Sequence, residues 1–185
     1  MYFIAVGLGY ILVEISLIQR FVLFLGHPTY ALTVVVFLML LSSGMGSLAS
    51  RTWIADYRRI WLPLCVIVLA ILTYTGTLPL LLDRLVGAPF FAKLIISAVV
   101  LVPLGFAMGM PFPTGLRGLA SKARPDENSI EWAWAMNAAS SVLGSVLAIV
   151  IAIQFGLNVT LACGAAAYFL ALLLQGKLQP ALSAR

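Results

Sequence analysis

The amino-acid sequence predicts an all-α integral membrane protein: one module over residues 1–185, a bundle of about six transmembrane helices with both termini cytoplasmic. Hydrophobic residues make up 63% of the chain and charged residues only 9%, against about 25% charged residues in a soluble domain. The mean hydropathy is +1.10. The apolar runs are also continuous, whereas a transmembrane barrel shows alternating segments of about ten residues. Composition and pattern therefore agree on a helical bundle.

Six apolar runs are each long enough to cross a bilayer. They cover residues 2–25, 30–50, 60–82, 89–110, 132–155 and 157–175. Glycine and proline at 26–28, 87–89 and 156 predict tight turns between them. Pro103 predicts a kink or a break in the fourth run, and Pro111 with Pro113 predicts its end. Residues 111–131 are expected to form a polar segment in or near the inner interface.

The distribution of lysine and arginine predicts the orientation, because cytoplasmic loops are enriched in these residues. The chain has eleven lysine and arginine residues. Eight of them lie in the second and fourth connections and the C-terminal tail, on one side of the membrane, and three lie on the other side. The eight are Arg51, Arg58, Arg59, Arg117, Lys122, Arg124, Lys177 and Arg185; the three are Arg20, Arg84 and Lys93. Both termini are therefore expected on the cytoplasmic side.

Several function classes find no support in the sequence. The formal charge of +5 is spread over short loops, as topology signals are, so no nucleic-acid partner is expected. Cys65 and Cys163 lie inside apolar runs, where a free thiol behaves as a small hydrophobe. No metal-ligand spacing, cofactor motif or catalytic constellation is present, so no cofactor is expected and the chain is not predicted to be an enzyme on its own.

Glu14 is the most informative residue, because it lies mid-way along the first apolar run. A carboxylate at that depth costs roughly 2.5–3.5 kcal/mol on insertion scales, which makes it the default candidate for a functional site. A partner has to come from another helix, and the candidates for an intramembrane polar site with Glu14 are Asn137, Ser43 and Ser141. Two interpretations stay open: a protonated structural acid, or a proton or substrate site.

Small residues gather in the inner half of the first, second, fourth and fifth predicted helices. The candidate helix-packing residues are Gly44, Gly46, Gly105, Gly109 and Gly144. Small residues let membrane helices approach closely, and serines can bridge them. The alternatives are close packing alone, or a small polar cavity beneath Glu14.

Three candidate residues belong to the outer face. Gln19 and Arg20 lie toward the outer end of the first helix, and the arginine is expected to extend to the outer headgroups. His27 lies in an outer turn without a second potential metal ligand nearby. Arg20 cannot pair with Glu14, because the two positions are about 120° apart around the helix axis.

Three parts of the chain together resemble the membrane part of bacterial spermidine synthase-like integral membrane proteins. The first is the segment Gly9–Leu32 (GYILVEISLIQRFVLFLGHPTYAL). The second comprises Ser43–Ser47 (SGMGS) and Gly109–Arg117 (GMPFPTGLR). The third is Trp132–Ser145 (WAWAMNAASSVLGS). The resemblance covers nearly the whole chain and implies a multi-pass protein of the bacterial inner membrane.

In that family, transmembrane helices are joined to a Rossmann-type aminopropyltransferase or methyltransferase-like domain. The glycine-rich turn and the catalytic aspartates of that domain have no counterpart here, since Asp56, Asp83 and Asp126 lie in loops of the membrane part. The resemblance therefore implies a non-catalytic membrane module or accessory subunit that anchors or scaffolds a larger complex. Its partners would be the lipid bilayer and other protein subunits or a separate soluble Rossmann-type domain.

Two alternatives remain. Six helices with both termini inside also match one half of a major-facilitator transporter, which would need a second copy or a partner to enclose a cavity for a small polar solute. The other alternative is the membrane half of a split polyamine aminopropyltransferase.

Overall fold

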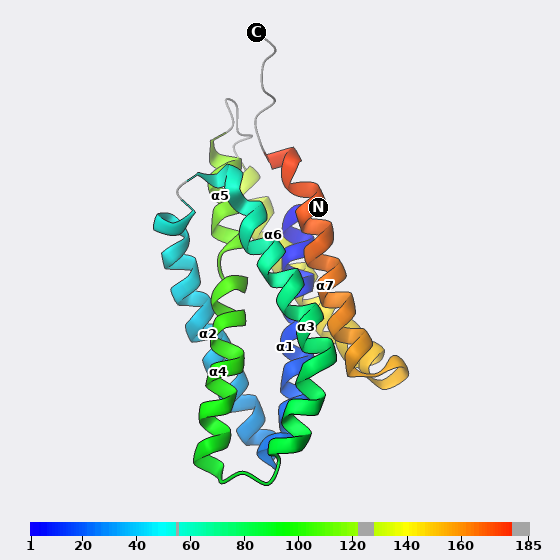
Figure 1. The fold of residues 1–185 in the computed structure, drawn as a ribbon. Helices are drawn as coiled ribbons and strands as arrows, with labels where there is room; N and C mark the ends of the chain where they lie inside the picture. Colours follow the sequence, from blue (N-terminus) through cyan, green and yellow to red (C-terminus); the bar gives the residue numbers. More distant parts are fainter. Residues whose placement is uncertain (55, 122–127, 179–185) are drawn as a thin grey trace.

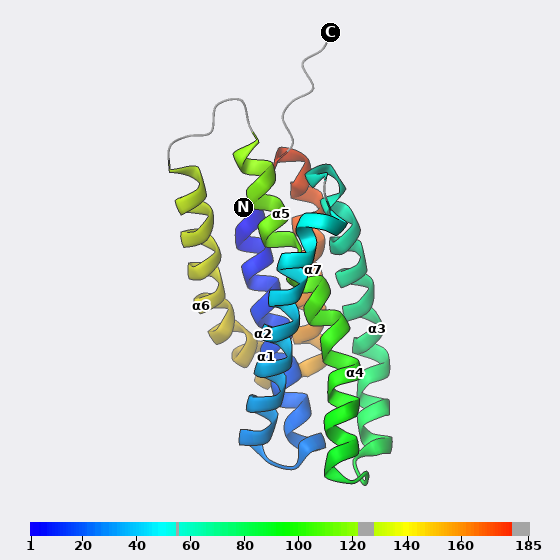
Figure 2. The same ribbon diagram turned by 90° about the vertical axis from the view of Figure 1, so that its left-hand side faces the viewer.

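A computed structural model describes residues 1–54, 56–121 and 128–178, and these form a bundle of long helices (Figures 1 and 2). The elements are α1 (Tyr2–Leu25), α2 (Pro28–Trp53), η1 (Tyr57–Ile60), α3 (Trp61–Leu85), α4 (Phe90–Met108), α5 (Pro111–Ala120), α6 (Ser129–Phe155), α7 (Leu157–Leu174) and η2 (Gln175–Leu178). Within the described ranges, six segments are long and apolar enough to span a membrane. The predicted six-helix, all-α class is confirmed.

α1 is the centre of the bundle. It packs against α6 and α7, and against α2 with which it is joined by the turn at Gly26. More than half of its side chains are buried. By contrast, α6 buries only Ala133, Ser140, Gly144 and Ala148, a single narrow stripe of small residues, and presents the rest of its surface outward. The peripheral helices thus expose broad apolar faces, as helices in contact with lipid do.

The helix ends follow the local sequence. Gly26 ends α1 in a left-handed conformation with φ 80°, which glycine adopts without a steric cost. Pro28 is the first residue of α2, a position where the missing backbone N–H is not needed. The observed bounds agree with the expected ones to within about three residues for the first, second, third, fifth and sixth spans.

The fourth span differs from the prediction. Pro103 lies inside α4, and the chain breaks only at Gly109 and Met110. Pro111 then begins the helix α5 instead of opening a polar loop, because proline is favoured in the first turn of a helix. The expectation that residues 111–120 form a loop is therefore wrong. Lys122, Arg124, Asp126 and Arg185 lie outside the described residues.

The N-terminus, α5 and the end of α7 lie at one end of the bundle, and the α1–α2 and α3–α4 turns lie at the other (Figures 1 and 2). We call these the inner and outer ends, following the orientation that the basic residues predict. Which end faces the cytoplasm is open to a direct experiment.

We expect Thr52 and Ser121 in the cytoplasm and Gly87 outside. All three residues are exposed, and Thr52 and Ser121 lie at the inner end of the bundle while Gly87 lies at the outer end. Single cysteines at these positions, in a chain whose Cys65 and Cys163 are replaced by serine, can be tested with an impermeant thiol reagent. In intact cells only the cysteine at 87 should react, and permeabilised cells should label at all three. Labelling at 52 and 121 with none at 87 would reverse the orientation.

Candidate functional site

The inner halves of α2 and α4 touch backbone to backbone. A Cβ atom at Gly46 would lie 1.9 Å from the Phe106 carbonyl oxygen, and one at Gly109 would lie 1.9 Å from the Ser43 carbonyl oxygen. At Gly105 the nearest atom would be the Ser42 hydroxyl oxygen, at 2.2 Å. Three of the five predicted packing glycines therefore form one contact, which leaves no room for a side chain.

A second close contact joins α1 and α6. The Asn137 side-chain amide donates to the Phe3 carbonyl at 3.0 Å, and the Ser141 hydroxyl donates to the Gly7 carbonyl at 3.3 Å. Further along, a Cβ atom at Gly144 would lie 2.4 Å from the Ile11 side chain. Both polar residues that the sequence offered from this helix are thus bonded to the backbone of α1.

Gly44 differs from the other four predicted packing glycines, because nothing lies within 4 Å of the position its Cβ would take. It faces a groove of about 510 Å³ that α1, α2, α6 and the α4–α5 junction line together. Figure 2 shows α2 and α6 on either side of α1 with the short helix α5 at the inner end. We call this the α2–α6 groove. Its polar lining consists of Tyr10, Ser43, Ser47, Asn137 and Ser141.

Glu14 lies on the face of α1 that is directed to this groove. It follows Tyr10 by four residues and Gly7 by seven, positions that share one helix face, and both of those residues line the groove. Only 8% of the Glu14 surface is exposed. Glu14 is therefore buried within the bundle, and the polar residues of the α2–α6 groove lie about one turn toward the inner end.

The pairing of Glu14 with Asn137, Ser43 or Ser141 is not formed. Asn137 lies level with Phe3, eleven residues before Glu14, which is roughly 16 Å along the helix at 1.5 Å per residue. Ser43 accepts from the Tyr10 hydroxyl at 3.4 Å, which places Ser43 about one helical turn away from the Glu14 carboxyl group. Within the described ranges, no hydrogen bond to the Glu14 side chain is present.

Tyr168 of α7 is a further buried polar group near this point that the sequence did not single out. Its side chain is 0% exposed, and its hydroxyl has no hydrogen-bond partner in the described structure. The ring packs against Gly9, where a Cβ atom would lie 2.9 Å from it. The one signal in the sequence is Gly9 itself, since a small residue in a membrane helix indicates a close contact with another helix. Of Glu14 and Tyr168, only the Tyr168 hydroxyl is a fully buried polar atom without a hydrogen-bond partner among the described residues.

The outer-face candidates have structural roles. The Arg20 guanidinium donates to the side-chain oxygen of Asn158 at the start of α7, so it joins two helices instead of extending to the headgroups as expected. The His27 imidazole Nδ1 caps α2 by accepting from the Thr29 backbone N–H at 3.2 Å. Gln19 is half-buried. These three residues do not converge on a common site.

Hydrogen bonds to two other helices hold the break between α4 and α5: one is donated by the Tyr2 side chain of α1, and one is donated by Arg117 of α5 to the backbone of α2. The Tyr2 hydroxyl donates to the Pro111 carbonyl at 3.0 Å, and the Arg117 guanidinium donates to the Ser50 carbonyl at 2.8 Å. Arg117 also donates to the Thr114 hydroxyl, at 3.0 Å, which itself donates to the Met110 carbonyl at 2.8 Å. Sequence reasoning missed both Tyr2 and Arg117, because neither role has a local signature. These hydrogen bonds fix the position of the α4–α5 junction, which forms the inner wall of the α2–α6 groove.

Chemically, the groove offers hydroxyl and amide groups in an apolar setting with a buried carboxyl group nearby. In the part of the chain that the structure describes, no three His, Cys, Asp or Glu side chains gather in a way that could hold a metal ion. Such a lining suits hydrogen bonding to a helix or to a small polar molecule.

Comparisons with known protein families, with curated proteins and with solved structures found no match. The fold and the composition define the class: a multi-pass helical membrane protein with broad apolar faces in contact with lipid.

Proposed function

We propose that this chain is a non-catalytic module of the bacterial inner membrane that scaffolds a larger complex, and that the α2–α6 groove receives a transmembrane helix of another subunit. This is the function implied by the resemblance to the membrane part of spermidine synthase-like proteins. The observation that supports it best is Gly44, a groove-lining glycine at which an added Cβ would have no neighbour within 4 Å.

The surface beside Gly44 is built for close approach. The opposite wall of the groove is formed by Trp134, Asn137 and Ser141 of α6, and the small, exposed Ala138 lies beside them on that helix. Small residues on facing walls let a third helix come near enough for backbone contact, which is how helices associate in lipid without a hydrophobic driving force. Large side chains such as those of Leu143 and Val146 cover α6 further out, as a lipid-facing surface would require.

The polar residues that line the groove would fix the position of the incoming helix along its axis. Tyr10, Ser43 and Ser47 lie along one wall, and Asn137 with Ser141 lies along the other. A serine, threonine or amide side chain on the incoming helix can bond to these groups at a gain of about 0.6–2 kcal/mol each. A soluble Rossmann-type domain carried by the same partner would then lie at the inner end.

A groove-filling variant tests this proposal. Gly44→Leu should remove the partner subunit from the protein purified in mild detergent from its native host, because the leucine occupies the groove. Gly76→Leu is the matched control, since Gly76 of α3 also faces open space but is outside the groove. Quantitative mass spectrometry of the purified complexes measures the partner. Equal partner recovery in both variants would exclude the groove as the scaffold surface.

The half-transporter alternative is favoured by a regularity in the packing. α1 packs on α6, α4 on α2, and α3 on α7. If the bundle is divided into α1–α2–α3 and α4–α6–α7, exchanging the two triplets reproduces these pairings, as inverted repeats of three helices would. The four helices α1, α2, α4 and α6 then line one face, which a second copy or partner would close into a cavity.

The same purification separates the alternatives by what is recovered. A different membrane subunit supports the scaffold, and a cross-linkable second copy across the groove supports the half-transporter. A soluble Rossmann-type subunit with the active complex making spermidine supports the split aminopropyltransferase.

A further inference from the structure

A second groove lies at the inner end, on the side of the bundle away from α6. It measures about 430 Å³, and α3 and α4 form its walls with the end of α2. We call it the α3–α4 groove. Its lining is almost wholly apolar and includes Trp53, Val66, Pro103 and Phe106. The Trp53 and Phe106 rings pack edge to face, with centroids 5.3 Å apart.

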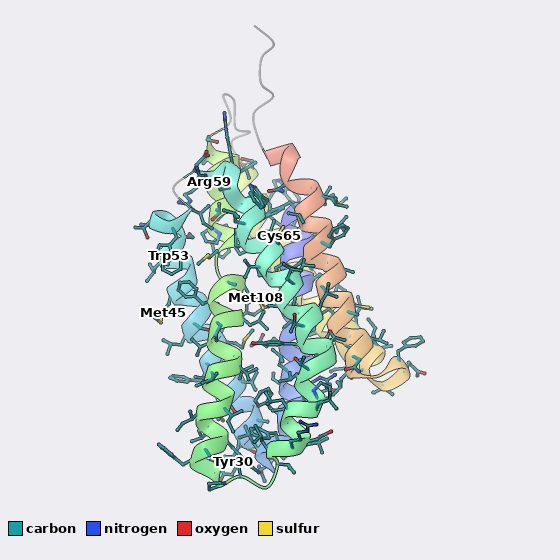
Figure 3. All side chains as sticks on the ribbon, viewed as in Figure 1. Tyr30, Met45, Trp53, Arg59, Cys65 and Met108 are labelled. Carbon is teal, nitrogen blue, oxygen red and sulfur yellow. The ribbon has the colours of Figure 1, made fainter. Side chains whose placement is uncertain are left out.

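Three arginines lie within a few residues of the segments that line the inner end of this groove. Arg51 lies in the last turn of α2, and Arg58 and Arg59 lie in η1, which leads directly into the groove-lining start of α3. All three are exposed. Figure 3 shows Arg59 and Trp53 toward the same end of the bundle. We call these three residues the arginine rim.

A further arginine adds to the positive charge near the arginine rim, and a single acidic residue lies in the connection between α2 and α3. α5, which holds Arg117, packs against η1 and adds a fourth guanidinium to this end. Asp56 is the acid of the connection, and its carboxylate is already used to accept the Arg58 backbone N–H at 2.9 Å. That bond involves the backbone of Arg58 alone, so among the described residues the Asp56 carboxylate forms no hydrogen bond with the guanidinium groups of the rim.

We propose that the α3–α4 groove and the arginine rim bind one anionic phospholipid. An acyl chain would lie in the apolar groove, and the headgroup phosphate would meet the guanidinium groups, whose planar donors suit phosphate oxygens. The charge complementarity and the placement of an apolar groove directly beneath a cationic rim fit a lipid better than a free anion. Trp53, exposed beside the rim, has the interfacial position that membrane tryptophans prefer.

This site is independent of the scaffold proposal, because it uses a different face of the bundle. The lipid would bridge the ends of α2, η1 and α3, and so should stabilise the inner end where the α4–α5 break lies. A structural consequence is therefore measurable without knowledge of the partner complex.

The test uses the full-length protein in detergent, titrated with phosphatidylglycerol, phosphatidylcholine or inorganic phosphate. Native mass spectrometry counts bound lipid, and thermal unfolding reports stabilisation. We expect selective binding and stabilisation by phosphatidylglycerol. Removing each rim charge should weaken that binding roughly fivefold, the factor that corresponds to about 1 kcal/mol.

The variants are Arg58→Gln with Arg59→Gln, and Arg51→Gln separately. Arg84→Gln at the outer end is the control, and its phosphatidylglycerol affinity should equal that of the wild type. Val66→Trp fills the groove and should weaken lipid binding while leaving the rim intact. Equal binding of both lipids, or unchanged affinity in the double rim variant, would overturn the proposal. Equal stabilisation by inorganic phosphate, with no effect of Val66→Trp, would show an anion site without a lipid.

Discussion

Gly46→Ala should destabilise the bundle by about 3 kcal/mol, the upper end of the range for overpacked interiors. A Cβ atom at this position would lie 1.9 Å from the Phe106 carbonyl oxygen and 2.8 Å from its carbonyl carbon. Those atoms belong to the backbone of α4, so no side-chain rotation can relieve the overlap, and the two helices have to separate. Unfolding in detergent, followed by circular dichroism, measures the loss.

The same helix supplies a matched control. Gly44→Ala adds the same methyl group two residues earlier, where nothing lies within 4 Å, so its stability should be unchanged or raised by up to about 1 kcal/mol from helix propensity. Gly109→Ala tests the contact from the α4 side and should be as damaging as Gly46→Ala. If Gly46→Ala and Gly44→Ala were equally stable, the backbone contact between α2 and α4 would not exist.

The fold could be predicted from the sequence to a large extent, because each span is a continuous apolar run bounded by a breaker. α1 illustrates this, since its predicted and observed bounds coincide at Tyr2 and Leu25. The end of the fourth span could be predicted but the helix α5 could not, because proline is common both just after the end of a helix and in the first turn of the next one. Tertiary bonds from Tyr2 and Arg117 accompany the second outcome here.

The candidate site was predictable in its residues but not in its geometry. Sorting small residues by depth correctly brought Ser43, Gly44, Gly109, Asn137 and Ser141 to one groove. Depth in the membrane does not determine which groups form hydrogen bonds, because that depends on the position of each residue along and around its helix. Asn137 is directed to the Phe3 carbonyl, and no sequence signal distinguishes that acceptor from the Glu14 carboxyl group.

The register of the helices explains why Glu14 is left without a partner. Gly144 of α6 lies level with Ile11, so the level of Glu14 on that helix is about three residues further, near Leu147 and Ala148. On the antiparallel helix α2, Tyr10 pairs with Ser43, which places Met39 near Glu14. Met39 and Ala148 are both fully buried and apolar. The carboxyl group therefore lies in an apolar layer, with hydroxyl groups only one turn away.

Glu14→Leu should consequently raise the stability of the isolated chain by about 1 kcal/mol, the lower end of the range for a buried polar group without a partner, because the Glu14 oxygens are not among the fully buried unpartnered atoms of the described residues. Unfolding in detergent measures the gain. Ser16→Ala is the control on the same helix, because the buried Ser16 hydroxyl already donates to the Leu12 carbonyl at 2.7 Å and its removal should be nearly neutral. A loss of stability in Glu14→Leu would show that the carboxyl group has a partner in the folded chain.

The assembled complex should respond in the opposite direction. If a helix in the α2–α6 groove supplies the missing hydrogen-bond donor to Glu14, Glu14→Leu should reduce partner recovery from the native host while making the free chain more stable. Glu14→Gln keeps a carbonyl acceptor of the same size and should retain the partner. An acid needed for proton transfer would instead keep its partner in both variants and lose the activity of the complex in both. The pair of substitutions thus separates a carboxyl group that binds from one that titrates.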